Sequence, residues 1–449
     1  MRLSVIGCGY LGAVHAACMA QLGHDVVGLE VDAAKAASLA AGRAPFHEPG
    51  FDELLAEALA SGRLRFTTDP DAIADAQVHF ICVGTPQQEG RYAADLRYVN
   101  AAVDTLIPRL TAHPDGPTLV VGKSTVPVGT AEAIAARIAD QAPTAGATLV
   151  WNPEFLREGF AIQDTLSPDR IVYGLPSELG EPTAAGETAR AVLDAVYADQ
   201  LERQQIVRLL TDYATAQLVK VAANSFLATK ISFINAMAEL CEATGADVTQ
   251  LATAIGYDDR IGAKFLRAGV GFGGGCLPKD IRAFMARAGE LGVDQALTFL
   301  REVDAINSRR REHVVALART ACGGELNGAR VAVLGAAFKP DSDDVRDSPA
   351  LDVASRIAGL GATVVVTDPA ALENVKRTRS DLHVVADPFE AARDADVVIL
   401  LTEWREYVAL DPVALGSVVR SAQIIDGRNA LDPAAWRAAG WTYTGLGRP

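Results

Sequence analysis

The sequence predicts an α/β fold in which two Rossmann-like, doubly wound domains are joined by a central helical segment. Three observations support this prediction: apolar strands alternate with helical stretches at both ends of the chain, a GxGxxG turn follows the first strand, and the middle third carries apolar residues at helical spacing. At roughly 150 residues per domain, the 449 residues correspond to about three domains. We place a dinucleotide-binding domain at residues 1–200, a helical domain at 201–322 and a second nucleotide-binding domain at 323–449.

The composition is that of a packed globular protein, with 49% hydrophobic and 22% charged residues. The formal net charge is 41 − 56 = −15, which argues against nucleic acid as the main partner. No apolar run reaches the roughly 18–20 residues that span a bilayer, so we expect no membrane segment. The six cysteines form no CxxC pair and the seven histidines show no HxxxH or HxxEH spacing, so we expect a cytoplasmic protein without a metal site.

The first 30 residues have the pattern of a dinucleotide-binding unit. An apolar strand at Arg2–Ile6 runs into the glycine turn Gly7-Cys8-Gly9-Tyr10-Leu11-Gly12, a helix at residues 13–22 and a second strand at Asp25–Leu29. Glu30 follows 18 residues after Gly12, close to the expected spacing of about 20. Its carboxylate suits a ribose diol and repels a 2′-phosphate, which favours NAD over NADP. The alternative is a glycine-rich turn that only serves packing.

Three further strands of the first domain each run into a polar segment. They lie at residues 78–83, 118–121 and 149–151, and are followed by Gly84-Thr85, by Lys123-Ser124-Thr125 and by Asn152-Pro153-Glu154. Alternation of strands with helices predicts a parallel sheet, whose carboxyl edge is where such folds bind ligands. Glu154 and Glu158 lie just beyond that edge, although a polar surface loop would give the same pattern.

The middle of the chain reads as helix from residue 207 to Gly245, which is a plausible C-terminal cap, and then to about residue 320. Lys220 and Asn224 are spaced i, i+4 on an otherwise apolar face. A lysine within such a stripe is costly unless it has a partner or a task. The alternative is a solvated lysine at the edge of the helix.

A glycine-dense loop at residues 269–275 interrupts this helical region and leads to Cys276. Pro278 suits the first turn of a following helix, so Cys276 is predicted to lie at a helix N-terminus, three residues before Lys279. Both features favour a thiolate, and we expect Cys276 to be a nucleophile. A buried structural role suits the other five cysteines better than it suits Cys276.

The last third repeats the beginning of the chain. A strand at residues 331–334 runs into Gly335, and ATVVVTD near residue 368 resembles HDVVGLEVD near residue 32. Only the first domain keeps the full GxGxxG, so the second is expected to bind a different nucleotide. The polar segment 338–346 follows the first strand of this domain, where it is either a ligand loop or a surface loop.

Nine stretches, taken together and in order, resemble the UDP-glucose/GDP-mannose dehydrogenase family. They are GCGYLG, CVGTP, KSTVPVGT, NPEFLREG, LVKVAANSFLATKISFIN, DDRIGAKFL, GFGGGCLPKD, AFKPDSDDVRDSP and IIDGRN, and they span essentially the whole chain. The resemblance implies a four-electron, NAD-dependent oxidation of UDP-glucose to UDP-glucuronate through a cysteine thiohemiacetal and thioester. It also implies a homodimer. PKD after the cysteine is more similar to the UDP-glucose branch than to the N-acetylhexosamine branch.

The resemblance also implies roles for individual residues. The catalytic set would be the nucleophile Cys276, the oxyanion-stabilising Lys220 and Asn224, the water-positioning Asp280 with Thr125, and the acid–base residue Glu154. The residues facing NAD would be Gly7, Gly9, Tyr10, Leu11, Gly12, Glu30, Lys35, Gly84, Thr85, Thr125, Glu158, Lys279 and Arg346. The UDP-sugar would contact Glu154, Phe155, Leu156, Arg157, Glu158, Lys220, Asn224, Phe265, Leu266, Arg267, Ala268, Gly269, Gly273, Phe338, Lys339 and Arg428, and Arg260 across a dimer interface.

Three positions depart from the family pattern: Gly275 replaces a usual serine, Ala236 a usual glutamate and Gln217 a common glutamate. None is a proposed catalytic group. Three other functions stay open. The same chemistry could act on UDP-N-acetylhexosamine, GDP-mannose or dTDP-glucose. A two-electron dehydrogenase of β-hydroxy acids would need neither Cys276 nor a second nucleotide domain. A non-catalytic nucleotide-sugar sensor would lack some of the catalytic polar groups that this chain keeps.

Overall fold

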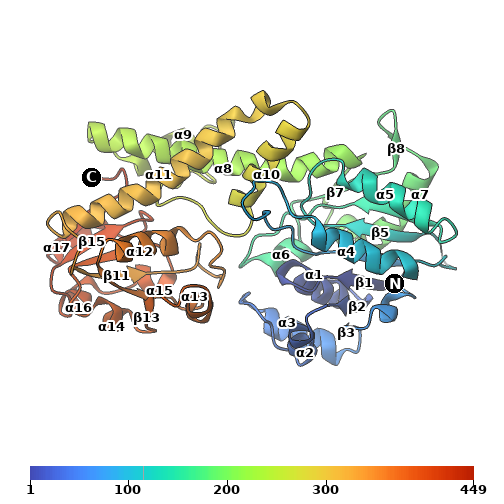
Figure 1. Ribbon diagram of the computed structural model, residues 1–449, viewed down its shortest axis with the longest axis horizontal. Helices are drawn as coiled ribbons and strands as arrows, with labels where there is room; N and C mark the ends of the chain where they lie inside the picture. The colour runs from blue at the N-terminus through green and yellow to red at the C-terminus, as the bar shows by residue number, and fades with distance from the viewer. Residues whose placement is uncertain (115) are drawn as a thin grey trace. The chain divides into compact units, whose positions relative to one another are not determined.

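The structure of the protein, a computed structural model, describes residues 1–114 and 116–449. The chain divides into two compact units. The first comprises Met1–Ala223 together with Arg282–Arg287, and the second comprises Asn224–Ile281 together with Ala288–Pro449. Each unit contains one large sheet covered by helices (Figure 1).

The sheet of the first unit has eight strands in the order β10-β7-β6-β5-β4-β1-β2-β3. The six strands from β6 to β3 in this order, which include β1 and β2, run parallel to one another. Strand β7 pairs with β6 in the antiparallel sense at Trp151 and Gly174, and β10 runs parallel to β7. The strands are β1 (Arg2–Ile6), β2 (Asp25–Leu29), β3 (Leu64–Thr67), β4 (Val78–Ile81), β5 (Thr118–Gly122), β6 (Ala147–Trp151), β7 (Arg170–Leu175) and β10 (Val207–Asp212). A small hairpin, β8 (Ser177–Glu178) with β9 (Glu181–Pro182), lies outside the sheet order.

Helices cover both faces of this sheet because its central strands are apolar on both sides. In β4, Val78 and Phe80 belong to one buried cluster, while Ile81 belongs to the other. A strand that is buried on both faces is typical of doubly wound folds. The helices are α1 (Tyr10–Gln21), α2 (Ala33–Ala40), α3 (Phe51–Ala60), η1 (Pro70–Ile73), α4 (Arg97–Leu106), η2 (Ile107–Arg109), α5 (Thr130–Gln141), α6 (Ala161–Leu166), α7 (Ala184–Val196) and the π-helix η3 (Asp199–Arg203).

The second unit contains a six-stranded, fully parallel sheet in the order β13-β12-β11-β14-β15-β16. Its first strand, β11, lies in the interior of the sheet between β12 and β14, just as β1 lies between β2 and β4 in the first sheet. The strands are β11 (Arg330–Leu334), β12 (Thr363–Thr367), β13 (His383–Val384), β14 (Val397–Leu400), β15 (Gln423–Asp426) and β16 (Thr442–Gly445). The helices around them are α12 (Pro349–Gly359), α13 (Leu372–Thr378), α14 (Pro388–Ala392), α15 (Arg405–Val408), α16 (Pro412–Gly416) and α17 (Pro433–Ala438).

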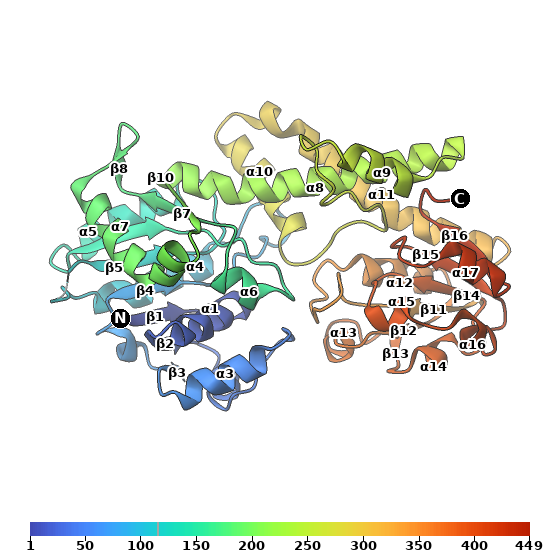
Figure 2. The ribbon, with the colours of Figure 1, turned by 180° about the vertical axis from the view of Figure 1, so that it is seen from behind.

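Long helices form the middle of the chain. They are α8 (Tyr213–Thr244), α9 (Val248–Gly256), α10 (Leu277–Glu290), η4 (Asp294–Leu297) and α11 (Thr298–Ala321). The C-terminal half of α8 lies beside α11 in the second unit (Figure 2), where the Ser232 hydroxyl donates to the Val303 carbonyl at 2.8 Å. Gly245 ends α8 in the left-handed conformation, with φ of 74°, as its capping role requires.

The predicted fold class is therefore confirmed, but the start of one helix and the direction of two strands differ. The helix predicted from residue 207 begins at Tyr213, because Val207–Asp212 forms the edge strand β10. A short apolar run does not distinguish a strand from a helix by periodicity alone, and pairing with β7 decides it here. The sheet is also not parallel throughout, since β7 and β10 reverse direction relative to the other six strands.

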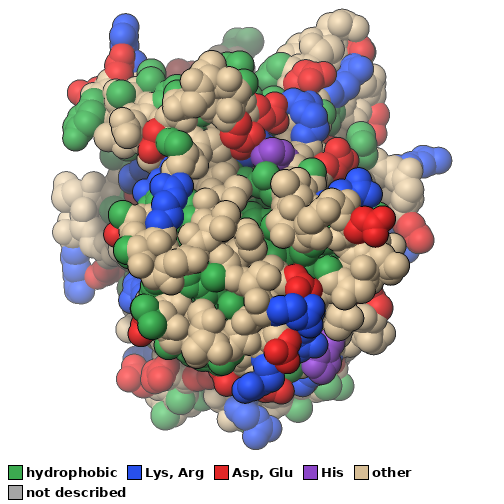
Figure 3. All heavy atoms as spheres, turned by 90° about the vertical axis from the view of Figure 1, so that its left-hand side faces the viewer, with side chains coloured by type: hydrophobic (Ala, Val, Ile, Leu, Met, Phe, Trp, Pro, Cys, Tyr) green, Lys and Arg blue, Asp and Glu red, His purple; other side chains and the backbone are tan. Residues whose placement is uncertain are grey.

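Acidic and basic side chains are interspersed over the face of the molecule that Figure 3 shows. Within residues 1–114 and 116–449, no helix combines the length and the apolar character that crossing a membrane requires.

Candidate active site

The carboxyl edge of the first sheet gathers the predicted ligand residues of the first unit. Gly7 follows β1, Glu30 follows β2, Thr85 comes after β4, Thr125 after β5 and Glu154 after β6. These five strands are parallel, so their carboxyl ends meet at the same edge. The strand order reverses between β1 and β4, which is where open α/β sheets bind ligands.

The glycine turn between β1 and α1 has the geometry that a pyrophosphate requires. Gly7 has φ of 87°, and a Cβ at Gly12 would lie 1.9 Å from the Gly7 carbonyl oxygen, so both positions require glycine. A Cβ at Gly9 would meet no protein atom within 4 Å. Gly9 is the N-cap of α1, so the open space lies at a helix N-terminus. The turn therefore fits a dinucleotide, with Leu11 half-buried on the first turn of α1.

Glu30 is buried at the end of β2 and faces this turn. One carboxylate oxygen accepts from the Cys8 amide and the other from the Asp32 amide, both at 3.0 Å. Each oxygen keeps a second lone pair for a ribose hydroxyl. Asp32 caps α2 by accepting from the Lys35 amide at 3.1 Å, and the Lys35 side chain is exposed. Glu30 is thus fixed as an acceptor at the edge of the predicted cofactor site.

Glu48 is a buried residue of this region that the sequence did not indicate. Its carboxylate accepts from the amides of Gly159 and Ala161, at 2.6 and 2.7 Å, and from the Tyr10 hydroxyl. Burial, and then the hydrogen bond to Glu48, raise the pKa of Tyr10. The Tyr10 ring is therefore committed to Glu48, and Glu48 ties the first turn of α1 to the loop of Glu158, which is half-buried.

The loops after β4 and β5 are joined directly. The Thr85 hydroxyl donates to the Thr125 carbonyl at 2.8 Å, and the Ser124 hydroxyl donates to the Val83 carbonyl at 2.7 Å. Gly84, which lies between these contacts, is exposed. The two predicted ligand segments, Gly84-Thr85 and Lys123-Ser124-Thr125, are therefore hydrogen-bonded to each other at the carboxyl edge of the sheet.

Lys220 pairs with Glu154 within the first unit. The Lys220 ammonium lies 3.0 Å from Glu154 Oε1, and both side chains are largely buried. Glu154 Oε2 accepts from the Leu156 amide at 2.6 Å, and Phe155 places its ring 5.6 Å from the Lys220 ammonium. The solvated-lysine alternative is therefore wrong. Arg157, by contrast, places its Nη2 2.6 Å from Asp164 Oδ1. The sequence did not indicate this ion pair.

Lys123 is a second buried lysine of the first unit, and no role was assigned to it from the sequence. Its ammonium donates to Asn152 Oδ1 at 3.0 Å and to the Tyr197 hydroxyl oxygen at 3.4 Å. Burial, reinforced by the charge of Lys220, lowers the pKa of Lys123 to about 8, although Cys82 and Glu154 act in the opposite direction. The first unit therefore carries two cations, Lys123 and Lys220, around one carboxylate.

Cys276 lies directly before α10 in the second unit, as predicted. It is exposed, and its carbonyl accepts from the Asp280 amide at 2.9 Å, so Cys276 is the N-cap of the helix. Pro278 occupies the first turn. The other cysteines are buried or half-buried, which distinguishes Cys276 from all five.

Asp280 follows Cys276 by one turn and is buried. Its Oδ2 accepts from Asn224 Nδ2 at 2.7 Å, and its Oδ1 pairs with Lys279. The structure thus brings together four predicted residues, Asn224, Cys276, Lys279 and Asp280, around the start of α10. The carboxylate is held in place by two donors and is acceptor-only while ionised.

The predicted sugar-nucleotide segment at residues 265–269 borders a cavity of about 340 Å³ in the second unit. Phe265 adopts φ of 65°, and Leu266 and Ala268 are buried while Arg267 extends to Glu403 at 3.3 Å. The Gly269 amide donates to Asn235 Oδ1 at 2.9 Å. Further residues lining the cavity are Val248, Thr249, Ala252, Thr253, Ala263 and Asn429.

The glycine loop also packs tightly against the segment after β11. A Cβ at Gly273 would lie 2.3 Å from the Asp347 carbonyl, and one at Gly274 would lie 2.8 Å from the Phe338 ring. The Lys339 ammonium lies 5.3 Å from the centre of that ring. The segment 338–347 is therefore a packing partner of the loop that carries Cys276.

The predicted arginines differ in their surroundings. Arg428 is half-buried and donates to the carbonyls of Leu401, Gly271 and Phe338 at 2.6, 3.1 and 2.9 Å. Burial lowers its pKa. Arg346 and Arg260 are exposed and pair with Asp344 and Asp258 respectively, both at 2.7 Å. Arg428 thus holds the glycine loop through main-chain contacts, and its contact with a uridine diphosphate stays a prediction.

The second sheet repeats the acidic position of the first. Asp368, at the end of β12, accepts from the amides of Ala336 and Ala337 at 2.7 and 3.0 Å, as Glu30 accepts from Cys8. Asp368 also accepts from the Trp404 indole at 3.1 Å and from two amides of its own turn. Because donors of the protein surround this carboxylate, it is less suited than Glu30 to bind a ribose diol.

Two of the three departures from the family pattern have a structural account. A Cβ at Gly275 would lie 2.3 Å from the Arg346 guanidinium, so a serine there needs a different arginine position. The Gln217 carboxamide accepts from the Ala131 amide and donates to Glu132, both at 3.0 Å, a pair of contacts that a carboxylate could not make. Nothing in the structure explains Ala236.

No group of three or more His, Cys, Asp or Glu side chains among residues 1–114 and 116–449 is arranged to hold a metal ion.

Comparison with known proteins defines the class and the family. The NAD binding domain of the UDP-glucose/GDP-mannose dehydrogenase family matches residues 1–199, its central domain residues 214–309 and its UDP binding domain residues 332–433. Together with the two sheets, these matches define a dehydrogenase with one NAD-binding and one UDP-binding domain. The chain belongs to the UDP-glucose/GDP-mannose dehydrogenase family.

Individual relatives are similar over their whole length. The UDP-glucose 6-dehydrogenase of Rhizobium meliloti is 42% identical over 450 residues, covering 100% of both chains. A UDP-glucose dehydrogenase structure from Pyrobaculum islandicum is 38% identical with a TM-score of 0.87, covering 100% of this chain and 98% of the other. A UDP-D-ManNAc dehydrogenase structure from Pyrococcus horikoshii is 27% identical with a TM-score of 0.85, covering 100% and 99%.

Glu30 is expected to make the enzyme prefer NAD over NADP. The loss of a charge-assisted hydrogen bond costs about 1.5–3 kcal/mol, and repulsion of the 2′-phosphate adds to it, so kcat/KM for NAD should exceed that for NADP by at least about 100-fold. Steady-state kinetics with both cofactors measures the ratio. Glu30→Gln removes the charge but keeps a hydrogen-bond acceptor, so it should reduce the ratio of kcat/KM for NAD to kcat/KM for NADP. Equal kcat/KM for NAD and NADP in the unaltered enzyme would contradict the assignment.

Proposed function

We propose that the protein oxidises UDP-glucose to UDP-glucuronate, consuming one water and two NAD⁺ and releasing two NADH and three protons. The observation that carries the four-electron reaction is the exposed Cys276 at the N-terminus of α10, beside Asp280 and Asn224. An oxidation that stops at the aldehyde needs no thiol. The choice of UDP-glucose is supported by the full-length relatives that carry this activity in their names.

Lys220 and Glu154 suit the proton and charge transfers of the first oxidation. When bound, NAD⁺ supplies the hydride acceptor in each of the two oxidations. The buried Lys220 ammonium stabilises negative charge on the sugar oxygen, and a buried donor of this kind is worth far more than one in water. Glu154, 3.0 Å from Lys220, accepts the proton that the alcohol loses.

Cys276 and Asp280 suit the second oxidation and the hydrolysis. The Cys276 sulfur bonds to the aldehyde carbon, and its position at a helix N-terminus favours the thiolate that attacks. Loss of the second hydride leaves a thioester. Asp280 takes a proton from the water that attacks the thioester, the carbon–sulfur bond breaks, and the free thiol returns. The two donors on Asp280, Asn224 and Lys279, keep its carboxylate oriented for that step.

The reaction stoichiometry tests this function. With limiting UDP-glucose and excess NAD, we expect two NADH per sugar and no free aldehyde. UDP-N-acetylhexosamines, GDP-mannose and dTDP-glucose, assayed in the same way, test the alternative substrates. One NADH per sugar from the intact enzyme would exclude the four-electron reaction, and faster turnover of another sugar nucleotide would exclude UDP-glucose as the preferred substrate.

We also propose a homodimer formed through α8. Phe226, Phe233 and Leu240 are exposed by 66%, 48% and 57%, and they recur every seven residues on one face of the helix. Arg260, whose guanidinium extends into solvent, would complete the partner's sugar site. Light scattering should give twice the chain mass for the active enzyme, and Phe233→Glu should halve it. Val413→Glu, at an apolar position of α16 that is exposed by 67%, is the matched control. A single-chain mass for active, unaltered enzyme would reject the dimer.

The proposed setting is a reducing compartment such as the cytoplasm. None of the six cysteines, all of which lie in the described part of the chain, forms a disulfide in the structure, and this includes the exposed Cys276 on which the reaction depends. An oxidising compartment would expose this thiol to disulfide formation or oxidation.

A further inference from the structure

The loop that leads to Cys276 has no regular secondary structure, yet most of its backbone is tied down. Val270 donates to the Gly427 carbonyl at 2.8 Å, and Gly274 donates to the Arg346 carbonyl at 2.9 Å. Between them, Phe272 is held entirely by side chains of α11. A loop of glycines loses much conformational freedom on ordering, so a fixed conformation requires such contacts.

Asn307 of α11 binds both backbone groups of Phe272. The Phe272 amide donates to Asn307 Oδ1 at 2.7 Å, and Asn307 Nδ2 donates to the Phe272 carbonyl at 2.9 Å. A Cβ at Gly271 would lie 2.4 Å from Asn307 Oδ1, so glycine at this position allows the approach. Asn307 thus satisfies the Phe272 amide and carbonyl as a neighbouring β-strand would, and these two hydrogen bonds fix the distance between the loop and α11.

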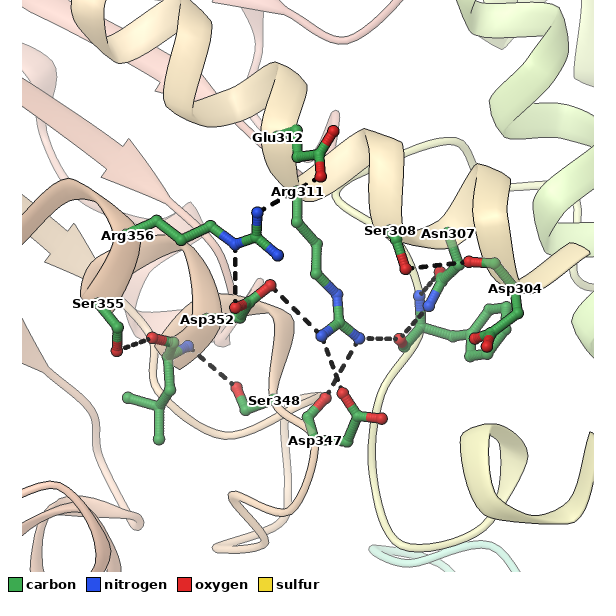
Figure 4. Close-up of polar contacts among 12 residues, drawn as sticks. Asp304, Asn307, Ser308, Arg311, Glu312, Asp347, Ser348, Asp352, Ser355 and Arg356 are labelled. Atoms are coloured by element: carbon green, nitrogen blue, oxygen red, sulfur yellow. Dashed lines mark hydrogen bonds and ion pairs between the residues drawn. The ribbon is translucent and has the colours of Figure 1, made fainter. Parts of the chain in front are cut away.

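Arg311, one turn further along α11, joins the same carbonyl to the second sheet domain (Figure 4). Its Nη2 donates to the Phe272 carbonyl at 3.1 Å, and its Nη1 donates to Asp347 Oδ1 at 2.8 Å. Asp352 lies 3.6 Å from the same guanidinium. Asp347 adopts φ of 44°, and its carbonyl is the atom against which Gly273 packs. The Arg311 guanidinium therefore connects α11, the glycine loop and the segment before α12.

We propose that Asn307 and Arg311 are positioning residues for Cys276, which hold its loop at the geometry that the second oxidation requires. The proposal rests on the proposed function of Cys276 as the nucleophile. Neither residue needs to touch substrate or cofactor. Both act through Phe272, four residues before the sulfur, and the intervening glycines have no side chains that could fix the loop by packing.

This role predicts different effects on the two oxidations. The first transfers a hydride from the sugar alcohol and uses Lys220 and Glu154, which belong to the first unit. The second requires the Cys276 sulfur on the aldehyde carbon. A misplacement of about 1 Å at a reacting atom can cost about 100-fold in rate. Loss of the Phe272 contacts should therefore slow the second oxidation far more than the first.

The test uses Arg311→Met and Asn307→Asp in single-turnover experiments with enzyme in excess over UDP-glucose. Arg311→Met keeps the side-chain length without the cation, and Asn307→Asp keeps an acceptor for the Phe272 amide but opposes an oxygen to the Phe272 carbonyl. We expect the first NADH to form within about threefold of the normal rate and the second to slow about 100-fold, with KM for NAD unchanged. Arg356→Met is the matched control, since Arg356 pairs with Asp352 and Glu312 but does not reach the loop (Figure 4).

Normal rates for both NADH phases, or an equal slowing of both, would overturn the proposal, because a purely structural defect does not separate the phases. If Arg311→Met does not fold, Asp347→Asn removes the charge of its main partner with little change of shape, and it should slow the second phase in the same way but by less. Cys276→Ala separates the two proposals. If it still forms two NADH, the nucleophile assignment fails. If it stops after the first while Arg311→Met behaves normally, only the positioning role fails.

Discussion

Replacing Cys276 with alanine is expected to lower kcat by several orders of magnitude. Alanine offers no atom that can bond to the aldehyde carbon, so the variant can at most perform the first oxidation. In other enzymes, removal of the catalytic nucleophile lowers kcat by factors of this size. The measurement is kcat from NADH formation, with UDP-glucose and NAD binding checked separately. If Cys276→Ala keeps more than about a tenth of normal kcat, a barrier change of under about 1.4 kcal/mol, the assignment is wrong.

A serine variant and a matched cysteine sharpen this test. Cys276→Ser can attack but leaves an ester, which hydrolyses far more slowly than a thioester, so it should stall with covalently held sugar. Intact-protein mass spectrometry detects that adduct. Cys322→Ala removes a half-buried cysteine in the second unit that no proposed step uses, and its kcat should be unchanged.

Replacing Lys220 with methionine is expected to lower kcat by about 10²–10³-fold, the loss found when one donor to a developing oxyanion is removed. The same change leaves the Glu154 carboxylate buried without its cation at 3.0 Å, and breaking a buried pair costs about 3–5 kcal/mol of stability. Steady-state kinetics and urea unfolding measure the two losses separately.

The double variant Lys220→Met with Glu154→Gln tests whether the loss of stability comes from the unpaired buried charge. It removes both charges, so the free energy of unfolding should recover toward that of the unaltered protein, while kcat stays low because both proposed catalytic groups are lost. Recovery of activity together with stability would mean that Lys220 only holds the fold. A kcat above a tenth of normal in the stable double variant would contradict the oxyanion role.

The sheet domains could be predicted from sequence because local rules and the global fold agree there. The GxGxxG turn with Glu30 fixes the first three elements, and the repeat of that pattern near Gly335 gives the second domain. Edge strand β10 could not be recognised, because its apolar run is compatible with helix until it pairs with β7. The reversed direction of β7 has no local signal either, since strand direction depends on the connection between elements.

The candidate site shows the same division. Cys276, Asp280 and Lys220 occur in motifs whose residue types already suggest chemistry, and the structure places them at a helix N-terminus or in a buried ion pair. Glu48, Lys123, Asn307 and Arg311 occur in no such motif. Each acts on backbone or side-chain groups far away in sequence, up to 113 residues for Glu48 and Ala161. Only the folded chain shows which groups they serve.

Lys123 is buried, and its amine binds a proton more weakly in the folded protein than in the unfolded chain. Its pKa falls from an ordinary 10.5 to about 8, which corresponds to a cost of roughly 3 kcal/mol at neutral pH. That cost is fully present below pH 8 and disappears as the pH rises toward 10.5, because the neutral amine is the form that burial favours. In this window unfolding takes up a proton, so Lys123 makes the folded protein more resistant to alkali rather than less. A series of urea titrations across that range would show no such gain if the pKa of Lys123 in the folded protein were the ordinary 10.5.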